Sequence, residues 1–153
     1  MAPDIEQMLE MHDASLVIGD PALKIDRSRY ITYDLAEEWI RLTGKPFVFA
    51  FWAVRQSALK DMRHDVDLAA VFQESRDHGL LPENLDRITR EWAPRLALSE
   101  AAIKSYLTES IHYSLDRDCL DGLQLFYQYA RECAAIPSAP QLFFVDAAKA
   151  AVI

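Results

Sequence analysis

The sequence predicts an α/β protein, with short strands in its first third and helices over the remaining two thirds. Residues 47–55 (FVFAFWAVR) are apolar up to Val54, which is typical of a strand buried on both faces. Upstream, residues 15–18 and 30–33 are short runs rich in β-branched, aromatic and aliphatic residues. From Gln56 onward the apolar residues recur at steps of three and four, which is the helical period.

The first third is expected to begin with a helix and to contain two strand-to-turn transitions. Pro3 and Asp4 are typical of a helix start, and the helix is expected to end near His12. The strand at 15–18 is expected to stop at Gly19-Asp20-Pro21, because proline cannot continue a strand ladder and glycine permits a sharp turn.

Capping signals in the sequence mark both ends of the next predicted helix. Asp34 followed by Glu37 fits an aspartate version of the capping box. Gly44 stands where a glycine commonly ends a helix, and Pro46 follows it. We therefore expect a helix over 34–43 that leads directly into the strand at 47–55.

Four helices are expected after that strand. The first is a long helix over 56–79, and the second, over 81–96, contains Pro94 as a kink or early stop. The third begins at Ser99, a good N-cap, and the fourth begins at Asp116 or Asp118 after an extended connection at His112-Tyr113-Ser114. Residues 142–145 are expected to form a closing strand or a packed tail.

Composition and charge exclude several classes of protein. The chain has 153 residues, a typical single-domain length, and a net charge of −8, which argues against a nucleic-acid or anionic-membrane surface. It shows no secretory signal after Met1. Cys119 and Cys133 fall in one predicted helix, about 20 Å apart at 1.5 Å per residue. We therefore expect reduced, buried thiols in a cytoplasmic protein.

Few residues point to chemistry by spacing alone. The sequence has no phosphate loop, no G-x-S-x-G motif and no paired-cysteine metal motif. His64 and Asp67 could share a metal ion, but they lie opposite the apolar stripe of their predicted helix, which favours a solvated face. We therefore expect no metal site, and for His112 a role at an element end.

Two charged residues lie at the ends of predicted strands. Asp20 follows the strand at 15–18, where open α/β sheets bind ligands, or it caps the short helix that Pro21 would begin. Arg55 ends the central strand and could pair with an anionic ligand, with Asp61 or with the carboxyl end of a helix. The residues leave both choices open.

Three linked motifs resemble the chorismate dehydratase family of menaquinone biosynthesis. They are LVIGDPAL at 16–23, YDLAEEW at 33–39 and TGKPFVFAFWAVR at 43–55, and the YLTE run at 106–109 is also similar to that family. The resemblance extends in the same order from about residue 3 to residue 145. Ala36 and Lys45 depart from the usual glycine and leucine of the family.

The resemblance implies a fold, a reaction and a set of site residues. It implies part of a type II periplasmic-binding-protein fold, one partial domain over 1–153 in which 1–46 belong to the second lobe and 47–153 return to the first. The implied reaction removes water from chorismate to give 3-(1-carboxyvinyloxy)benzoate in the cytoplasm, with no cofactor. The implied substrate-binding residues are Gly19, Asp20, Phe49, Trp52 and Arg55, with the catalytic acid and base unassigned.

The family has an amino-terminal segment before the first of these motifs, so this chain corresponds to the carboxyl-terminal half. We therefore expect the chain to be inactive by itself, with chorismate as its only small-molecule partner. The alternative is a non-catalytic, solute-binding-like or truncated module that associates with itself or with an amino-terminal half. The sister 1,4-dihydroxy-6-naphthoate synthase of the same pathway is a further enzyme alternative.

Overall fold

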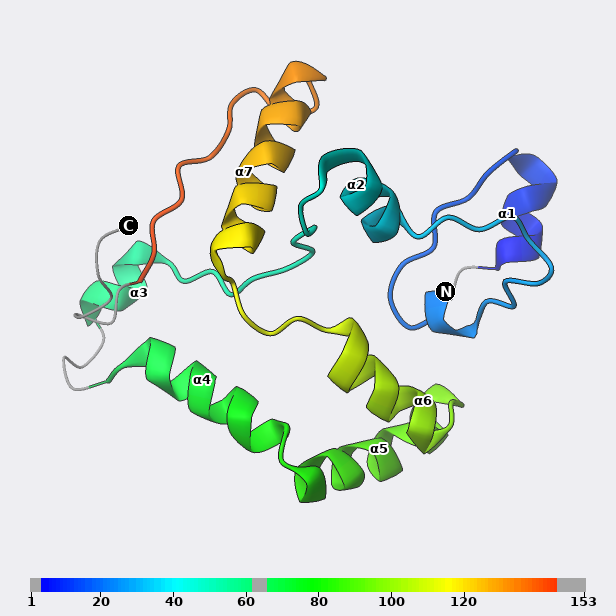
Figure 1. Cartoon of the computed structure of the whole chain (residues 1–153), viewed down its shortest axis with the longest axis horizontal. Helices are drawn as coiled ribbons and strands as arrows, with labels where there is room; N and C mark the ends of the chain where they lie inside the picture. Colours follow the sequence, from blue (N-terminus) through cyan, green and yellow to red (C-terminus); the bar gives the residue numbers. More distant parts are fainter. Residues whose placement is uncertain (1–3, 62–65, 146–153) are drawn as a thin grey trace.

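The computed structural model describes residues 4–61 and 66–145. Its elements in chain order are α1 (Ile5–Met11), the 3-10 helix η1 (Ala22–Lys24), α2 (Leu35–Thr43), α3 (Gln56–Asp61), α4 (Leu68–Gly79), α5 (Pro82–Leu96), α6 (Glu100–Ser105), the π-helical stretch η2 (Tyr106–Ser110) and α7 (Arg117–Glu132). They follow one another along an open path, with α2 and α7 on one side and α4, α5 and α6 on the other (Figure 1).

The helix starts predicted from capping residues are confirmed. The carboxylates of Asp4, Asp34 and Asp116 and the hydroxyl of Ser99 each accept a hydrogen bond from a backbone N–H in the first turn of the following helix. Helix α2 also ends as expected, because Gly44 adopts the left-handed conformation (φ 68°) and donates its N–H to the carbonyl of Ile40.

The predicted strands are absent from the described residues. Segments 15–18, 31–34 and 45–55 are connections without regular structure, as are residues 141–145. The prediction of an α/β fold, and of a partial type II periplasmic-binding-protein fold with it, is therefore wrong for the part of the chain that the structure describes. The division of the chain at residue 46 stays a prediction.

The physical reason is that a strand needs a neighbour for its backbone hydrogen bonds, whereas a helix satisfies its own. The three β-prone segments, 15–18, 30–33 and 47–55, form no strand ladder with one another. Phe47 instead meets Trp39 of α2 and Phe126 of α7, and Trp52 stacks on Phe72 of α4. The expected helix over 56–79 is also interrupted, since Asp67 caps α4 by accepting a hydrogen bond from Ala70 N–H.

The first packed group joins α2, α7 and the segment that follows α2. The Trp39 ring meets Phe47 and Phe126 edge to face, at centroid distances of 5.7 and 6.0 Å. Gly122 allows the backbone of α7 to approach the chain at Pro46, where a Cβ would stand 2.2 Å from the Pro46 carbonyl oxygen. Helix α2 and the segment that follows it therefore meet α7, which is distant from them in sequence, at one close contact.

Charged side chains reinforce this contact at its edge. Lys45 Nζ lies 3.1 Å from a carboxylate oxygen of Asp118 and 3.1 Å from one of Asp121. The hydrogen bonds to Asp121 and Asp118 raise the pKa of Lys45, and the hydrogen bond from Lys45 lowers the pKa of Asp121. These partners fix where the segment after α2 crosses the start of α7.

The second packed group is formed by α4, α5 and α6. The Asn84 side chain donates from Nδ2 to the His78 carbonyl at 2.7 Å and so closes the turn between α4 and α5. Leu85 and Thr89 of α5 and Ile103 of α6 are buried, and Lys104 of α6 pairs with Asp86 of α5 at 2.7 Å. This group forms one wall of the candidate site.

The chain exposes more surface than a compact monomer of its mass, and many large apolar side chains are among the exposed residues. The accessible surface is 12565 Å² for a mass of 17.5 kDa, whereas a compact monomer of that mass exposes about 7,900 Å². The exposed side chains include Ile31, Phe49 and Trp52.

Candidate functional site

A cavity of about 260 Å³ lies where the turn before η1 meets the second packed group. Its lining comes from that turn, from η1, from α5 and the connection after it, and from α6 and η2, and consists of Asp20, Leu23, Ile88, Trp92, Leu96, Leu98, Ala102, Ile103, Tyr106 and Leu107. Asp20 is the only charged residue in this lining. The cavity is therefore apolar and aromatic with one carboxylate at its wall, a common composition for a small-molecule site.

The local backbone places Asp20 in this wall. Gly19 adopts a left-handed conformation (φ 69°), and its carbonyl accepts a hydrogen bond from Ala22 N–H at 2.9 Å. Pro21, not Asp20, is the N-cap of η1, and this end has no side-chain capping bond. The carboxylate of Asp20 is therefore not used as the helix cap that the sequence offered as its alternative role.

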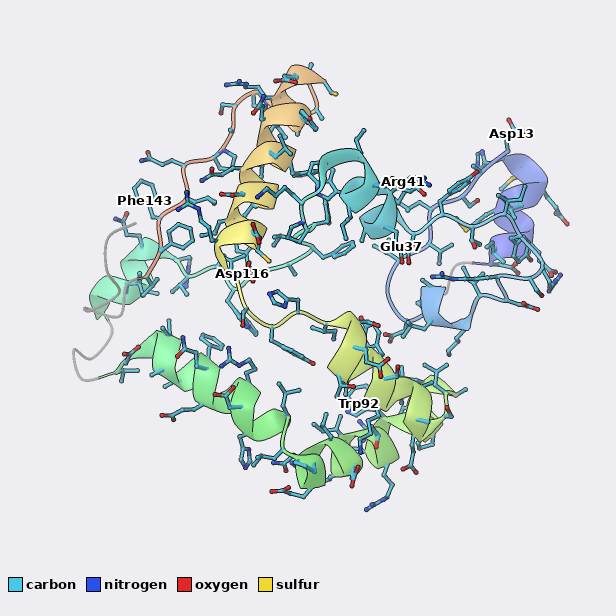
Figure 2. All side chains as sticks on the ribbon, viewed as in Figure 1. Asp13, Glu37, Arg41, Trp92, Asp116 and Phe143 are labelled. Carbon is cyan, nitrogen blue, oxygen red and sulfur yellow. The ribbon has the colours of Figure 1, made fainter. Side chains whose placement is uncertain are left out.

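The opposite wall follows from the helical period of α5. Ile88, Trp92 and Leu96 recur at steps of four, and Trp92 lies where α5 approaches α6 (Figure 2). The Arg95 guanidinium lies 5.1 Å from the centroid of the Trp92 ring. It also pairs with Glu91 at 3.0 Å, so a positive charge stands beside this aromatic wall.

The predicted site residues separate into two groups. Gly19 and Asp20 belong to the cavity wall or its turn, whereas Phe49, Trp52 and Arg55 are not in the lining. Phe49 is 75% exposed and meets the Phe47 ring at 4.8 Å, and Trp52 is 79% exposed and stacks on Phe72 at 4.8 Å. The structure thus does not bring these five residues to one place.

The residues that sequence reasoning missed are those of the opposite wall. They include Trp92, Ile103 and Tyr106. Their apolar spacing was visible in the sequence, but a cavity between two helices and a distant turn depends on tertiary packing. Among the lining residues, only Asp20 had a local sequence signal for a site, because it stands where an apolar run is broken by Gly19-Asp20-Pro21.

A second cluster lies at the amino-terminal end of α7, where Asp116 is labelled in Figure 2. His112 Nε2 lies 3.0 Å from Asp116 Oδ2, and the ligand atoms of His112, Asp116 and Cys119 all lie within 4.8 Å of one another. Burial and then the Asp116 carboxylate raise the pKa of the Cys119 thiol. The backbone N–H of Cys119 and then His112 lower the pKa of Asp116.

The other sequence candidates can be placed briefly. His64 lies outside the described residues, and its proposed partner Asp67 caps α4. Cys119 and Cys133 are free thiols, but only Cys119 is buried, so the expectation of burial is wrong for Cys133. Within 4–61 and 66–145, no helix has both the length and the apolar character needed to span a bilayer.

Comparison with known proteins bears on the family. No solved structure matches the chain at a significant level. A family model described as menaquinone biosynthesis matches residues 1–132, which is most of the 153 residues. That match confirms the resemblance found in the three motifs, and the chain therefore belongs to the menaquinone biosynthesis family.

Proposed function

We propose that the chain acts in the dehydration of chorismate, a carbon–oxygen lyase step of menaquinone biosynthesis in the cytoplasm, with the Asp20 cavity holding the substrate ring. Membership of the menaquinone biosynthesis family supports the pathway. The observation that carries the site is a lone carboxylate in a cavity otherwise walled by aliphatic and aromatic side chains. Such a wall suits a ring that turns one hydrogen-bond donor toward the carboxylate.

The chemistry of the reaction fits a modest site. Chorismate loses its ring hydroxyl and one ring proton as water, and the ring becomes aromatic, so no electrons are exchanged with a second reactant. The protein needs to orient the substrate and to assist proton transfer. We assign no catalytic acid or base.

Charge sets the orientation of the substrate. Both carboxylates of chorismate would be repelled by Asp20, so they must point away from it, whereas the ring hydroxyl can donate to its carboxylate oxygen. The lining itself has no cation to hold the two carboxylates. We therefore propose that the chain binds the ring but does not complete the reaction by itself.

The test combines turnover with binding. The purified chain is incubated with chorismate, and 3-(1-carboxyvinyloxy)benzoate is measured by liquid chromatography with mass detection. Saturation-transfer NMR reports contact between the protein and the ring protons of chorismate. We expect no product above the uncatalysed level and a clear saturation transfer. Product formed by the chain alone would disprove the proposed inactivity, and absence of transfer would disprove the proposed site.

A matched pair of variants locates the binding. Ala102 lines the cavity, so Ala102→Leu fills it and should weaken chorismate binding at least tenfold. Ala101 is exposed and precedes it in α6 without lining the cavity, so Ala101→Leu should bind as the parent chain does. Equal weakening by both variants would reject the location.

We propose as a second function that two copies of the chain associate through residues 46–54 (PFVFAFWAV). The chain exposes about 4,700 Å² more than a compact monomer of its mass, as its 12565 Å² shows. One partner in a large obligate interface contributes about 2,500 Å². This excess covers the whole chain, and within 46–54 the side chains of Phe49, Phe51 and Trp52 contribute to it with exposed fractions of 75%, 45% and 79%.

The segment 46–54 favours a second copy as the occupant. It has no charged residue, so antiparallel pairing with itself brings no like charges together. It has no regular secondary structure, so its backbone is available for pairing, and a two-fold dimer would cover the same patch on both chains.

Sedimentation velocity over a hundredfold concentration range tests the association. The parent chain should sediment as a dimer, and Phe49→Lys or Trp52→Lys should sediment as a monomer. Ile31→Lys alters an 89% exposed residue outside the segment and should stay dimeric. A monomeric parent chain would contradict the association, and dimeric Phe49→Lys and Trp52→Lys variants would contradict the surface.

A further inference from the structure

We propose that His112, Asp116 and Cys119 form a binding site for a divalent transition-metal ion of the zinc type. The three residues offer an imidazole nitrogen, a carboxylate oxygen and a sulfur within 4.8 Å of one another. Zinc binds these three atom types at about 2.0–2.3 Å in tetrahedral geometry, which separates its ligand atoms by somewhat less than 4.8 Å. Small side-chain rotations therefore bring all three to one ion.

The type of ligand favours this class of ion over magnesium or calcium. A thiolate and an imidazole suit zinc and its neighbours, whereas magnesium and calcium require oxygen ligands. With a neutral imidazole, a carboxylate and a thiolate, the site carries two negative charges, which balance a divalent cation. On binding, the thiol transfers its proton to solvent as the sulfur–metal bond forms.

The position of the carboxylate is already determined. Asp116 Oδ1 accepts a hydrogen bond from Cys119 N–H at 2.9 Å as the cap of α7, and this leaves Oδ2 facing His112 at 3.0 Å. A ligating carboxylate held by a second hydrogen bond is the usual support for a bound metal ion. One oxygen thus orients the group while the other can bind the ion.

The connection that carries His112 is also anchored. The Tyr113 hydroxyl donates to the Leu107 carbonyl of η2 at 3.0 Å. The side chains of His112 and Asp116 are 64% and 50% exposed, so an ion can enter from solvent. Three protein ligands leave a fourth position for water, and the bound ion would link the connection after η2 to the start of α7.

Cobalt substitution tests this proposal without reference to enzyme activity. The purified chain is treated with a chelator, dialysed and titrated with Co²⁺, and a thiolate-to-cobalt charge-transfer absorption in the near ultraviolet is followed. We expect one equivalent to saturate the absorption and Zn²⁺ to displace it. Visible absorption bands with the intensity typical of four-coordinate Co²⁺ should accompany the charge-transfer absorption. No charge-transfer absorption would reject the site.

Four variants identify the ligands. Cys119→Ser should abolish the charge-transfer absorption, and Cys133→Ser, which changes the other thiol, should leave it unchanged. His112→Ala and Asp116→Asn should each weaken Co²⁺ at least tenfold, and asparagine still caps α7. Circular dichroism confirms that each variant retains its helices. Absorption retained in Cys119→Ser, or affinity unchanged in both His112→Ala and Asp116→Asn, would overturn the assignment.

Discussion

Replacing Gly122 by alanine places a methyl group against the backbone of Pro46. The added Cβ would lie 2.2 Å from the Pro46 carbonyl oxygen and 3.3 Å from its carbonyl carbon. Because the obstacle is backbone and not the end of a flexible side chain, α7 and the segment after α2 must move apart. That movement also loosens the Trp39–Phe126 contact and the pairs made by Lys45.

Two opposing terms set the size of the effect. Alanine in a helix interior gains about 1 kcal/mol over glycine. Overpacking at a tight contact costs about 1–3 kcal/mol, and a contact of 2.2 Å with backbone belongs at the upper end. We therefore expect Gly122→Ala to lower the free energy of unfolding by about 1–2 kcal/mol.

Urea denaturation followed by circular dichroism measures this difference. Gly79→Ala is the matched control, because Gly79 ends α4 and its added Cβ meets nothing within 4 Å. The control should gain about 0.5–1 kcal/mol from the lower entropy of its unfolded chain. A Gly122→Ala chain as stable as the parent, beside a stabilised control, would refute the close contact between α7 and Pro46.

Three further predictions concern the two packed groups. Trp39→Phe should lower the free energy of unfolding by less than about 1 kcal/mol, because Trp39 Nε1 has no hydrogen-bond partner in the described structure. Trp39→Ala should lower it by about 2–4 kcal/mol in urea unfolding. Equal losses for the two variants would contradict this reasoning. Asn84→Ala should cost about 0.5–1.5 kcal/mol in thermal unfolding, because the His78 carbonyl loses the hydrogen bond from Asn84 Nδ2 and keeps the one from Leu81 N–H, and an unchanged midpoint would speak against the Asn84 bond. The pKa of Asp121 is lower in the folded chain than in the unfolded chain, where it is about 4. Ionised Asp121 therefore stabilises the fold at pH values above about 4, and this stabilisation is lost as the pH falls through the folded pKa. Lys45→Met should therefore flatten the acid limb of a stability–pH profile, and an unaltered limb would show that the pair contributes nothing.

Local signals in the sequence were sufficient for the starts of four helices, but not for the boundary between α3 and α4. The capping roles of Asp4, Asp34, Ser99 and Asp116 depend on the side chain and on the next three backbone N–H groups, all within one turn. Such contacts form in any chain that carries the residues in that order. For this reason the starts of α1, α2, α6 and α7 were predictable.

The prediction of strands was wrong because a strand is stabilised by contacts with residues that are distant in sequence. An apolar run such as 47–55 predicts that its side chains will be buried, but it does not predict which element will cover them. In this structure Phe47 contacts Trp39 and Phe126, both from helices, so the run contributes to packing without a sheet. Whether such a run packs in a sheet or against a helix is determined by tertiary structure.

The site was predictable only in part for the same reason. The turn at Asp20 has a local cause, but Trp92 and Tyr106 join it through the packing of α5, α6 and η2. Cys119 was read as a buried thiol and His112 as part of a connection. Their proximity to Asp116 becomes visible only once α7 and its preceding segment have coordinates.

The tryptophan indole signals provide the most direct test of the proposed chorismate site. The chain has three tryptophans, Trp39, Trp52 and Trp92, and of these only Trp92 lines the cavity. A ¹⁵N-labelled chain titrated with chorismate reports each indole N–H separately, with single Trp→Phe variants for assignment. We predict that the Trp92 signal shifts and saturates while those of Trp39 and Trp52 stay in place. A shift of Trp52 with Trp92 unmoved, or no shift in any of the three, would contradict the account.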